Sequence, residues 1–579
     1  MNVLNVVQSI TGQAWRWRGT AAEGLAPDDL VTQLLLARGC PRDALDAHRT
    51  PAIRDFMPDP SIFRDMDKAA ERLADAVERR EAVTIFGDYD VDGATSAALM
   101  VRLLRSLGLS PAVYIPDRLT EGYGPSAAAL TRIAADGARL IVTVDCGAQA
   151  HDALSAAHAC GIDVVVVDHH KCDARLPLAH ALVNPNRLDE TDGAAHGHLA
   201  AVGVAFLLGA ALLRTLRARG TFANLPEPRL LDLLDLVALG TVADVAQLRG
   251  LNRAFVAQGL KVMAAGRNIG LKALIAAARL TRAPTATDLG FALGPRINAG
   301  GRIGRSDLGV RLLTTADPDE AAALAAELDR LNEDRRAIEG AVQSDADLQS
   351  HAGSVAVVAG LGWHPGVIGI VAGRLKEKLG RPAIVIALDE HGIGKGSGRS
   401  IAGVDLGQAV LAAREAGLLV AGGGHAMAAG LTIAADRVPD FTAFLEERLA
   451  GAGARATADR SLLLDGIFAP GGLTPDLVTA MEVGGPYGMG WPAPRVAAGP
   501  VRIVKADVVG NGHVRAIVSG EDGRGFKGVA FRAADGLLGQ ALLAAPPHRR
   551  LWLAGRIKLD DWGARPAAEL HIEDAAWAD

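Results

Sequence analysis

Three apolar runs in the first third of the chain are each followed at once by aspartate or histidine side chains. The runs are AVTIF (82–86), RLIVTV (139–144) and IDVVVV (162–167). The polar side chains that follow them are Asp88, Asp90, Asp92, Asp145, Asp168, His169 and His170. Carboxylates and imidazoles are ligands for divalent metal ions, so these positions indicate metal chemistry.

The elements that would position these side chains are buried parallel strands. The runs are too continuous for half-exposed strands, and the segments between them, such as 97–107 and 150–159, have helical spacing. This alternation predicts a doubly wound α/β domain. Because the carboxyl ends of its strands meet at one edge of the sheet, we expect the seven side chains to form one cluster.

A cluster with this many carboxylates needs cations. An unpaired buried carboxylate costs several kcal/mol or stays protonated. The mixture of carboxylates and imidazoles suits Mn²⁺ or Mg²⁺ better than a thiolate-bound metal. There are enough ligands for two ions about 3.5–4 Å apart, which is an arrangement used to hydrolyse phosphoryl groups.

Each segment taken alone has a simpler interpretation. DYDVDG is similar to a calcium-binding loop, but the glutamate expected further on is missing, and such a segment alone is more often a turn. Asp145 alone would be a helix N-cap, and a single histidine is usually structural. It is the convergence of three strand ends that favours a functional site.

The remaining chain predicts a long helix, a second α/β unit and a small β-barrel. The helix spans 317–350, with apolar side chains at Leu324, Leu328, Leu331 and Ile338; its pattern fits a domain connector and a surface helix equally well. The second unit has strands near 354–359 and 382–388, ends in GGGHAMAAG (422–430) and precedes a linker (451–459). Short runs at 501–509, 513–520, 526–532, 550–559 and 567–575 are typical of a closed barrel.

Length and composition set outer limits. A chain of 579 residues suggests several domains, and 49% apolar with 22% charged residues is typical of a globular protein. The start lacks a secretory pattern, and the apolar stretch 230–248 contains three aspartates, so we expect a cytoplasmic protein without a membrane span. The four cysteines form no CxxC pair, which argues against a disulfide framework or structural zinc. The net charge of −6 neither supports nor excludes a polyanionic substrate.

Four segments resemble the motifs of the DHH phosphoesterase superfamily: GDYDVDGATS, TVDCG, VVVDHH and LGTVADVAQL. Further segments resemble the bacterial RecJ family of single-stranded-DNA exonucleases, from about residue 30 to the last strands. They are LTEGYGPS (119–126), GPRINAGGRIG (294–304), GWHPGVIGIVAGRL (362–375), GKGSGRSI (394–401) and GGGHAMAAG. One loop departs from the family pattern: GGPYGMGWPAP (484–494) has Trp491 and Ala493 where Asn and Glu are usual, which puts its role in doubt.

The resemblance implies an α/β fold with a parallel-sheet DHH catalytic domain, a long helix, a second α/β (DHH-associated) domain and an OB-like β-barrel. The implied ranges are an N-terminal segment packing on the core (1–75), the catalytic domain (76–315), the connecting helix (316–351), the substrate-binding domain (352–452) and the single-strand-binding barrel (460–579). The implied activity is 5′-to-3′ hydrolysis of single-stranded DNA to 5′-mononucleotides by two divalent ions, Mn²⁺ or Mg²⁺, in recombination and repair.

The resemblance also assigns roles to individual residues. It implies metal binding by Asp90, Asp92, Asp145, His169 and Asp244. It implies catalytic roles for Asp88, Asp168 and His170, with His170 facing the scissile phosphate. Candidates for DNA and its 5′-phosphate are Arg118, Arg296, Arg302, His364, Ser397, Arg399 and His425. We expect Ser397 and Arg399 on a glycine-rich turn, whose composition alone favours a flexible loop.

The barrel segments carry basic residues and two aromatic residues that would suit a single strand. The basic residues are Arg502, Lys505, Arg515, Lys527, Arg532, Arg556 and Lys558. Phe531 and Trp552 could stack on bases, but we expect both in the core.

Partners and alternative functions complete the expectations. Single-stranded DNA with a 5′ end is the expected partner; single-strand-binding protein and a RecQ-type helicase are implied by the family alone, and we expect a monomer. The main alternative is a DHH-type phosphodiesterase that cuts short oligonucleotides or cyclic nucleotides, although the extra barrel and long helix speak against it. A third is a replication scaffold without metals, which the intact aspartates disfavour.

Overall fold

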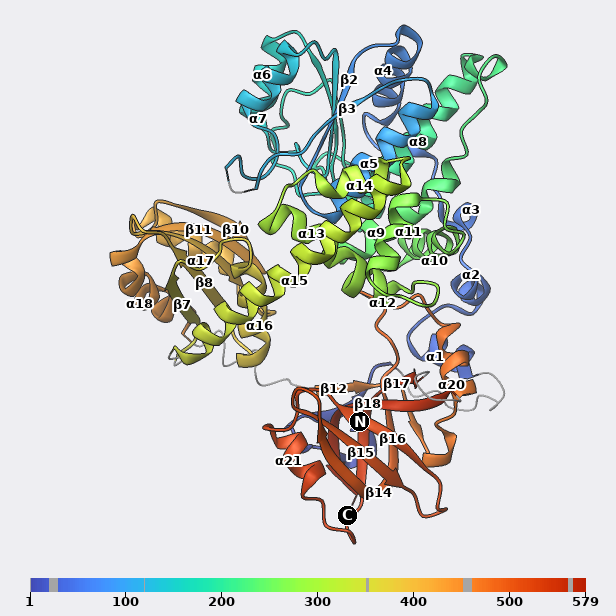
Figure 1. Cartoon of the computed structure of the whole chain (residues 1–579), viewed down its shortest axis with the longest axis vertical. Coiled ribbons are helices and arrows are strands. Elements are labelled where there is room, and N and C mark those ends of the chain that lie inside the picture. Colours follow the sequence, from blue (N-terminus) through green and yellow to red (C-terminus); the bar gives the residue numbers. More distant parts are fainter. Residues whose placement is uncertain are drawn as a thin grey trace. The chain divides into compact units, whose positions relative to one another are not determined.

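The computed structural model describes residues 2–19, 30–118, 120–349, 353–450, 461–560 and 566–578 (Figure 1). The chain forms two compact units. One, here called the α/β unit, contains Pro58–Ala246 and Gln258–Asp459. The other, the barrel unit, contains Met1–Met57, Gln247–Ala257 and Arg460–Asp579.

The first sheet of the α/β unit has five parallel strands in the order β3-β2-β4-β5-β6. They are β2 (Val83–Gly87), β3 (Ala112–Tyr114), β4 (Leu140–Val144), β5 (Asp163–Val167) and β6 (Ala181–Val183). The three apolar runs are therefore buried parallel strands, as predicted. Alternate strand residues, such as Ile141 and Val164, pack against α6 (Ala127–Ala135) and α7 (His151–Ala159) on one face.

Helix α8 (Ala201–Ala218) contacts both α4 (Met66–Arg79) and α5 (Val91–Ser106), and all three helices contact strands of the same sheet. Helix α5 begins directly after β2 because Asp90 caps it: its Oδ1 accepts hydrogen bonds from the N–H groups of Asp92 and Gly93. Helix α8 is long and apolar enough to cross a membrane, but 72% of that stretch is buried inside the fold, as in the core helix of a globular protein.

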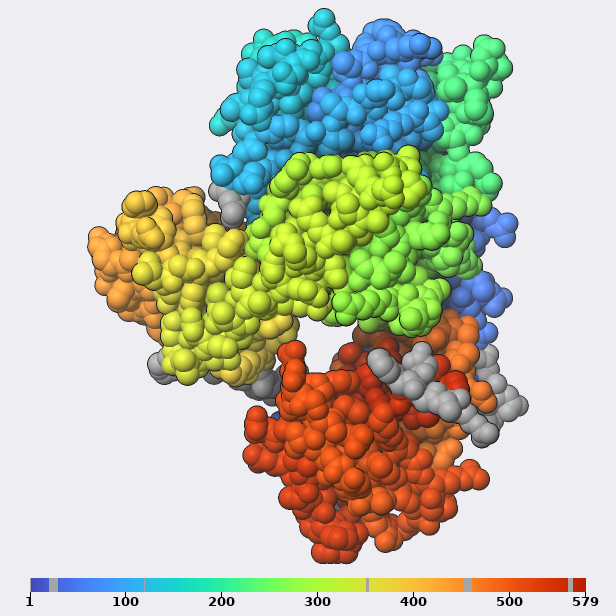
Figure 2. All heavy atoms as spheres, in the orientation of Figure 1, coloured from blue at the N-terminus to red at the C-terminus, as the bar shows by residue number. Residues whose placement is uncertain are grey.

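A group of helices follows the sheet. It comprises α9 (Leu234–Ala243), α10 (Gly250–Ala264), α11 (Ile269–Ala277), α12 (Ala286–Asp288), α13 (Gly294–Ile303), α14 (Leu308–Thr314) and α15 (Pro318–Leu348). The long predicted helix is α15, capped by Asp317. It contacts α11, α13 and α14, and also α16 and β7 of the next domain, so the connecting interpretation is confirmed over the surface one. Figure 2 shows the yellow-green atoms of α13–α15 lying directly against the blue and cyan part of the unit.

The second sheet of the α/β unit has the order β10-β11-β9-β8-β7. Its strands are β7 (Ala356–Leu361), β8 (Ala383–Leu388), β9 (Ile393–Arg399), β10 (Ala421–His425) and β11 (Ala428–Ala434), with helices α16 (Ile368–Leu379), α17 (Leu406–Glu415) and α18 (Val438–Leu449). GGGHAMAAG is thus the β10–β11 hairpin.

The prediction that GKGSGRS forms a turn is wrong, because it is the strand β9, paired with β8 and β11. Its glycines alternate, and a Cβ at Gly396 or Gly398 would lie 2.5–2.6 Å from the side chains of Leu431 or Leu406. The glycine face of β9 therefore packs against the core, while Ser397 and Arg399 lie on the other face. Glycine-rich composition suggested a loop, but close packing is what selects it here.

The barrel unit contains five strands that close on themselves, β14-β15-β16-β18-β17, with β17 pairing back to β14. They are β14 (Val496–Val509), β15 (His513–Ser519), β16 (Gly525–Ala530), β17 (Leu551–Asp560) and β18 (Ala567–Trp577). This order is an OB-like barrel, as predicted. Helices α1 (Leu30–Ala37), α2 (Leu45–Arg49), α3 (Ile53–Phe56), α20 (Pro475–Glu482) and α21 (Leu537–Leu543) and strand β13 (Gly466–Phe468) complete the unit.

The N-terminal strand β1 (Ala14–Trp17) pairs with β12 (Ser461–Leu464) of the barrel unit. Trp15 is fully buried and donates a hydrogen bond to the buried carboxylate of Asp574 at 2.8 Å. The N-terminal segment is therefore part of the same compact unit as the C-terminal barrel. The other domain boundaries given by the sequence analysis stay predictions.

Two features of the barrel unit bear on the sequence analysis. Phe531 is 54% exposed and lies edge-on to His513 and His571, so its expected place in the core is wrong; Trp552 is half-buried and packs on the β1–β12 region. In the loop 484–494, the guanidinium of Arg253 donates hydrogen bonds to the carbonyls of Gly484, Gly485 and Pro486. This guanidinium also lies over the Trp491 ring, so Trp491, which stands where the family usually has Asn, has a packing role within the unit.

Candidate metal centre and phosphate site

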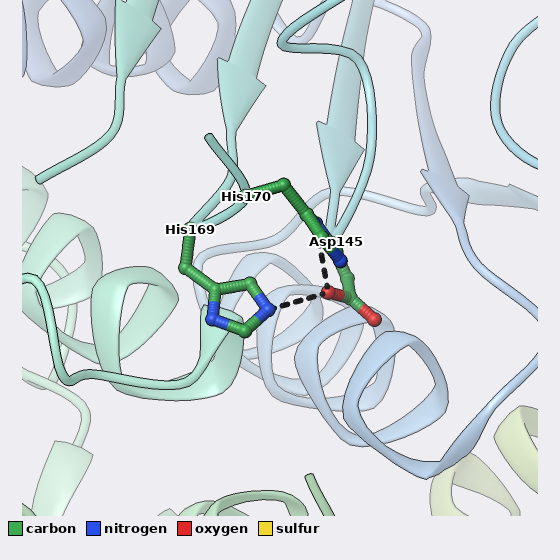
Figure 3. A group of neighbouring side chains, drawn as sticks. All are labelled: Asp145, His169 and His170. Carbon is green, nitrogen blue, oxygen red and sulfur yellow. Dashed lines mark ion pairs between the residues drawn. The ribbon is translucent and has the colours of Figure 1, made fainter. Parts of the chain in front are cut away.

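The cluster is built at adjacent strand ends. Gly87, Val144 and Val167, the last residues of β2, β4 and β5, are in register. Asp88, Asp145 and Asp168 therefore leave the sheet side by side, and all three are buried. Asp244 joins them from the C-terminus of α9. Figure 3 shows Asp145 facing the two histidines that follow β5.

Distances confirm that the predicted ligands converge. His169 Nε2 lies 3.3 Å from Asp145 Oδ1 and 3.9 Å from Asp92 Oδ2, and His169 Nδ1 lies 3.8 Å from Asp244 Oδ2. The candidate ligands form three overlapping sets, and within each set the ligand atoms lie within 4.8 Å of one another. They are Asp145, His169 and His170; Asp92, His169 and Asp244; and Asp88, Asp90 and Asp145.

Neighbouring backbone fixes the orientation of the carboxylates. The two oxygens of Asp92 accept hydrogen bonds from the N–H groups of Ala201 (2.6 Å) and Val202 (3.0 Å), at the start of α8. Helix α9 approaches closely at Gly240, where a Cβ would lie 2.9 Å from Asp92 Oδ1 and 2.3 Å from Thr95 Oγ1. Asp145 has φ 61°, a strained backbone conformation of the kind found at functional sites.

The electrostatics of the cluster fit a bound cation. Burial and the Asp90 charge raise the pKa of Asp88 to about 8 and that of Asp244 to about 7. Burial and neighbouring aspartates raise the pKa of Asp92 and Asp145 well above the usual value. Asp88 Oδ1, Asp145 Oδ1 and His169 Nε2 are buried without a hydrogen-bond partner among the described residues. Divalent ions would supply both the missing charge and the missing partners.

The two histidines have different electrostatic environments. Burial lowers the pKa of His169 to about 4, so its imidazole is neutral, as a metal ligand must be. Burial also acts on His170, but the hydrogen bond from its Nδ1 to Asp168 Oδ1 (2.8 Å) raises its pKa to about 9. Despite its burial, Asp168 has its pKa lowered to about 2 by the same contact. His170 is therefore an imidazolium at neutral pH.

Arg118, Arg302 and Arg399 have no carboxylate partner among the described residues. Arg118 lies near Asp88 and Arg302 near Asp90, whereas Arg399 lies near Arg118. Burial, with Arg118 and Arg335 nearby, lowers the pKa of Arg302 to about 10, and burial with Arg118 lowers that of Arg399. Arg399 Nη1 donates to Ser397 Oγ at 3.2 Å. Both side chains lie against the first turn of α16, where a Cβ at Gly369 would lie 3.0 Å from Ser397 Oγ and 3.1 Å from Arg399 Nη2.

The other predicted substrate residues separate into three cases. Arg296 forms an ion pair with Asp329 at 2.8 Å and is largely buried, so its charge is already paired within the fold. His364 lies on the turn before α16, where its Nδ1 accepts a hydrogen bond from the Gly366 N–H and the Gly366 carbonyl accepts one from Arg302. His425 is exposed at the end of β10.

His425 lines a cavity of about 340 Å³. The cavity is also lined by Lys171, Asp405, Gln408, Arg414 and the glycines 422–424. Because Lys171 directly follows His170, the cavity joins the β10–β11 hairpin to the DHH segment.

Sequence analysis gave no role to Tyr123, although TEGYG was among the quoted segments. Its hydroxyl donates to the Asp145 carbonyl at 3.0 Å and lies 3.1 Å from His170 Nδ1. Asn184 and Asn186 were also not predicted as site residues, although their side chains donate hydrogen bonds to the backbone carbonyls of His170 and His169. The detectable signal was VNPN, two amide side chains directly after a buried strand.

Comparisons with known proteins agree with this geometry. The DHH family N-terminal domain matches residues 82–241, the DHHA1 domain 352–451 and the RecJ OB domain 464–574. The chain is 38% identical to the single-stranded-DNA-specific exonuclease RecJ of Dickeya dadantii, over 96% of this chain and 98% of that protein. It is also 38% identical to Escherichia coli RecJ, with 94% and 95% covered.

A solved structure is similar over nearly the whole chain. The crystal structure of Thermus thermophilus RecJ in complex with Mn²⁺ matches with a TM-score of 0.77 and 30% identity, covering 94% of this chain and 75% of that one. A second structure of that protein contains Mg²⁺. The sequence, the three domains and the fold together place this chain in the RecJ family of single-stranded-DNA-specific exonucleases.

Proposed function

We propose that this protein is a metal-dependent exonuclease that degrades single-stranded DNA from its 5′ end and releases 5′-mononucleotides. The observation that carries the proposal is the buried cluster of aspartates and His169 at three adjacent strand ends. Beside it lie Arg118 and Arg302, which have no carboxylate partner among the described residues. Relatives of nearly equal length are named single-stranded-DNA-specific exonucleases.

Asp90, Asp92, Asp145, Asp244 and His169 would hold two divalent ions, Mn²⁺ or Mg²⁺. When bound, such ions lower the pKa of a water nucleophile and stabilise charge on the phosphate. Asp88 lies in the same cluster and shares a set of ligand atoms with Asp90 and Asp145.

His170 would act on the scissile phosphate. With Nδ1 bound to Asp168, its protonated ring presents the Nε2–H group as a charged donor for a phosphate oxygen. Asp168 holds the ring and keeps it protonated. Hydrolysis of the bond between the phosphorus and the 3′-oxygen of the first nucleotide leaves a new 5′-phosphate on the shortened strand.

Arg118, Arg302, Arg399 and Ser397 would bind the terminal 5′-phosphate. Guanidinium groups hold two phosphate oxygens at once, and the N-terminus of the twelve-residue helix α16 adds a favourable dipole. Three like charges side by side repel one another, and the terminal phosphate would supply the anion that offsets this repulsion. Recognition of the end would make the enzyme an exonuclease.

The remaining features of the proposal rest on the family alone. They are the roles of His364 and His425 in substrate binding, action in recombination and repair, association with single-strand-binding protein and a RecQ-type helicase, a cytoplasmic location and a monomeric state. Within the barrel unit, several predicted DNA-binding cations are already paired: Lys505 and Arg515 with Asp507, and Lys527 with Glu569. Strand binding there would depend more on stacking than on charge.

One experiment separates this function from its alternatives. The protein is incubated with Mn²⁺ and a long single strand labelled at either end, with di- to pentanucleotides, and with a cyclic dinucleotide. Release of mononucleotides from the 5′ end of the long strand supports the proposal. Cleavage confined to short or cyclic substrates favours the phosphodiesterase alternative, and binding without cleavage favours a scaffold.

A further inference from the structure

We propose that Asn184 and Asn186 are positioning residues that hold the two DHH histidines for metal binding and catalysis. Both belong to the segment VNPN, which leaves the short edge strand β6. Neither belongs to the proposed metal ligands. They act through the backbone of His169 and His170, which the structure places within hydrogen-bond reach of both amides.

The two histidines lie beyond the end of β5, where no neighbouring strand of the described part of the chain supplies hydrogen bonds. Three side chains satisfy their four backbone groups instead. Asp168 Oδ1 accepts from the N–H groups of His169 (2.8 Å) and His170 (3.1 Å). Asn186 Nδ2 donates to the His169 carbonyl (2.5 Å) and Asn184 Nδ2 to the His170 carbonyl (2.8 Å). The N–H group and the carbonyl of each histidine are thereby both held by a side chain.

Asn186 also fixes the ring of His169. Its Nδ2 donates a second hydrogen bond to the Gly197 carbonyl at 3.1 Å. Two residues further on, the Leu199 carbonyl lies 3.1 Å from His169 Nδ1 and accepts a hydrogen bond from its N–H group. That contact leaves the Nε2 lone pair directed at Asp145 and Asp92. One amide thus ties the backbone of the ligand to the segment that selects its tautomer.

Asn184 is fully buried and supports the other half of the pair. Its Oδ1 accepts from the Asn186 N–H at 2.7 Å, and its Nδ2 reaches Cys172 Sγ at 3.3 Å in addition to the His170 carbonyl. Each Nδ2 faces two acceptors, which determines the orientation of both amides. The expected division is that Asn186 governs metal affinity through His169, whereas Asn184 governs turnover through His170.

Gly197 gives an independent way to disturb Asn186. Its backbone passes so close that a Cβ there would lie 2.4 Å from Asn186 Oδ1. Gly197→Ala should therefore displace the amide without removing it. A matched control is Asn268, a buried asparagine of the same unit that accepts from the Leu271 N–H and caps α11.

The inference rests on the proposed metal-dependent function, and its test has a readout besides activity. Mn²⁺ is titrated into wild type and variants while free Mn²⁺ is followed by electron paramagnetic resonance, and kcat is measured on a 5′-labelled strand at saturating Mn²⁺. We expect Asn186→Ala and Gly197→Ala to raise the Mn²⁺ Kd about 10- to 100-fold, the usual effect of outer-shell changes. Asn184→Ala should lower kcat about tenfold or more with the Kd within about threefold of wild type.

Each outcome decides one claim. If Asn186→Ala and Gly197→Ala bind Mn²⁺ no more weakly than Asn268→Ala, the positioning role is refuted. Where Asn186→Ala fails to fold, Asn186→Asp keeps the shape, loses both N–H donors and is judged by the same threshold. If wild type itself binds no Mn²⁺, it is the proposed function that fails.

Discussion

The crowding of carboxylates predicts that the metal-free protein loses stability as the pH rises. Asp88 offers the clearest case, because its pKa is raised from 3.8 to about 8. Between these values the native carboxyl keeps its proton while the unfolded one has lost it. The native state then binds more protons, so the free energy of unfolding falls by about 1.4 kcal/mol per pH unit.

The substitution Asp88→Asn removes this titration and retains the shape of the side chain. From pH 5.5 to 7.5 the variant should therefore gain about 3 kcal/mol relative to wild type. The α/β unit has about 400 residues, so its unfolding entropy is about 0.8 kcal/mol per degree and the gain corresponds to about 3–4 °C in Tm.

The assay is scanning calorimetry in a chelator at both pH values, for wild type and Asp88→Asn. The difference in Tm between the two proteins excludes the contribution of every other group that titrates equally in both. Saturating Mn²⁺ should remove the relative gain, since a bound ion supplies the missing charge. A Tm difference that stays the same at both pH values in the chelator would refute the electrostatic reasoning.

Three further predictions concern other parts of the site. Arg399→Ala should raise the KM for 5′-phosphorylated strands at least about tenfold more than the KM for 5′-hydroxyl strands; equal increases would argue against the end-binding role. Gly240→Ala should push on Asp92 and weaken Mn²⁺ binding in the same titration, whereas Gly340→Ala, at an open position of α15, should leave it unchanged. Phe531→Ala should raise the KM for long strands about 5- to 100-fold without lowering Tm, as expected for a lost base contact. Leu537→Ala, at another exposed apolar position, is the control. An unchanged KM for Phe531→Ala would show that Phe531 does not bind the strand.

Apolar periodicity and the side chains at the strand ends predicted the first parallel sheet and its carboxylate cluster correctly. Continuous apolar runs become parallel strands because both faces of the sheet are covered, and the sheet then brings Asp88, Asp145 and Asp168 together without further information. The barrel followed from alternating runs in the same way. These parts depend on local pattern and on one general rule of sheet geometry.

The parts that failed depend on long-range packing. GKGSGRS has the composition of a loop, and only the side chains of Leu431 and Leu406 explain why a strand needs glycine there. Arg296 is paired with Asp329 of another helix, a long-range contact that its neighbours in the sequence do not reveal, and its role in DNA binding stays a prediction. Asn184 and Asn186 have no motif of metal chemistry, because their function is carried by hydrogen bonds to backbone.

The most direct test of a metal-dependent 5′ exonuclease site is single-turnover release of the first nucleotide from a 5′-labelled single strand in Mn²⁺, with wild type and Asp145→Asn. Asp145 belongs to two of the three sets of ligand atoms. Wild type should release only the 5′-mononucleotide. Asp145→Asn should still bind the strand, but its single-turnover rate should fall by more than the roughly 10- to 100-fold that changes to outer-shell residues cause. Cleavage by Asp145→Asn at the wild-type rate, or release of internal fragments by wild type, would contradict the proposed function.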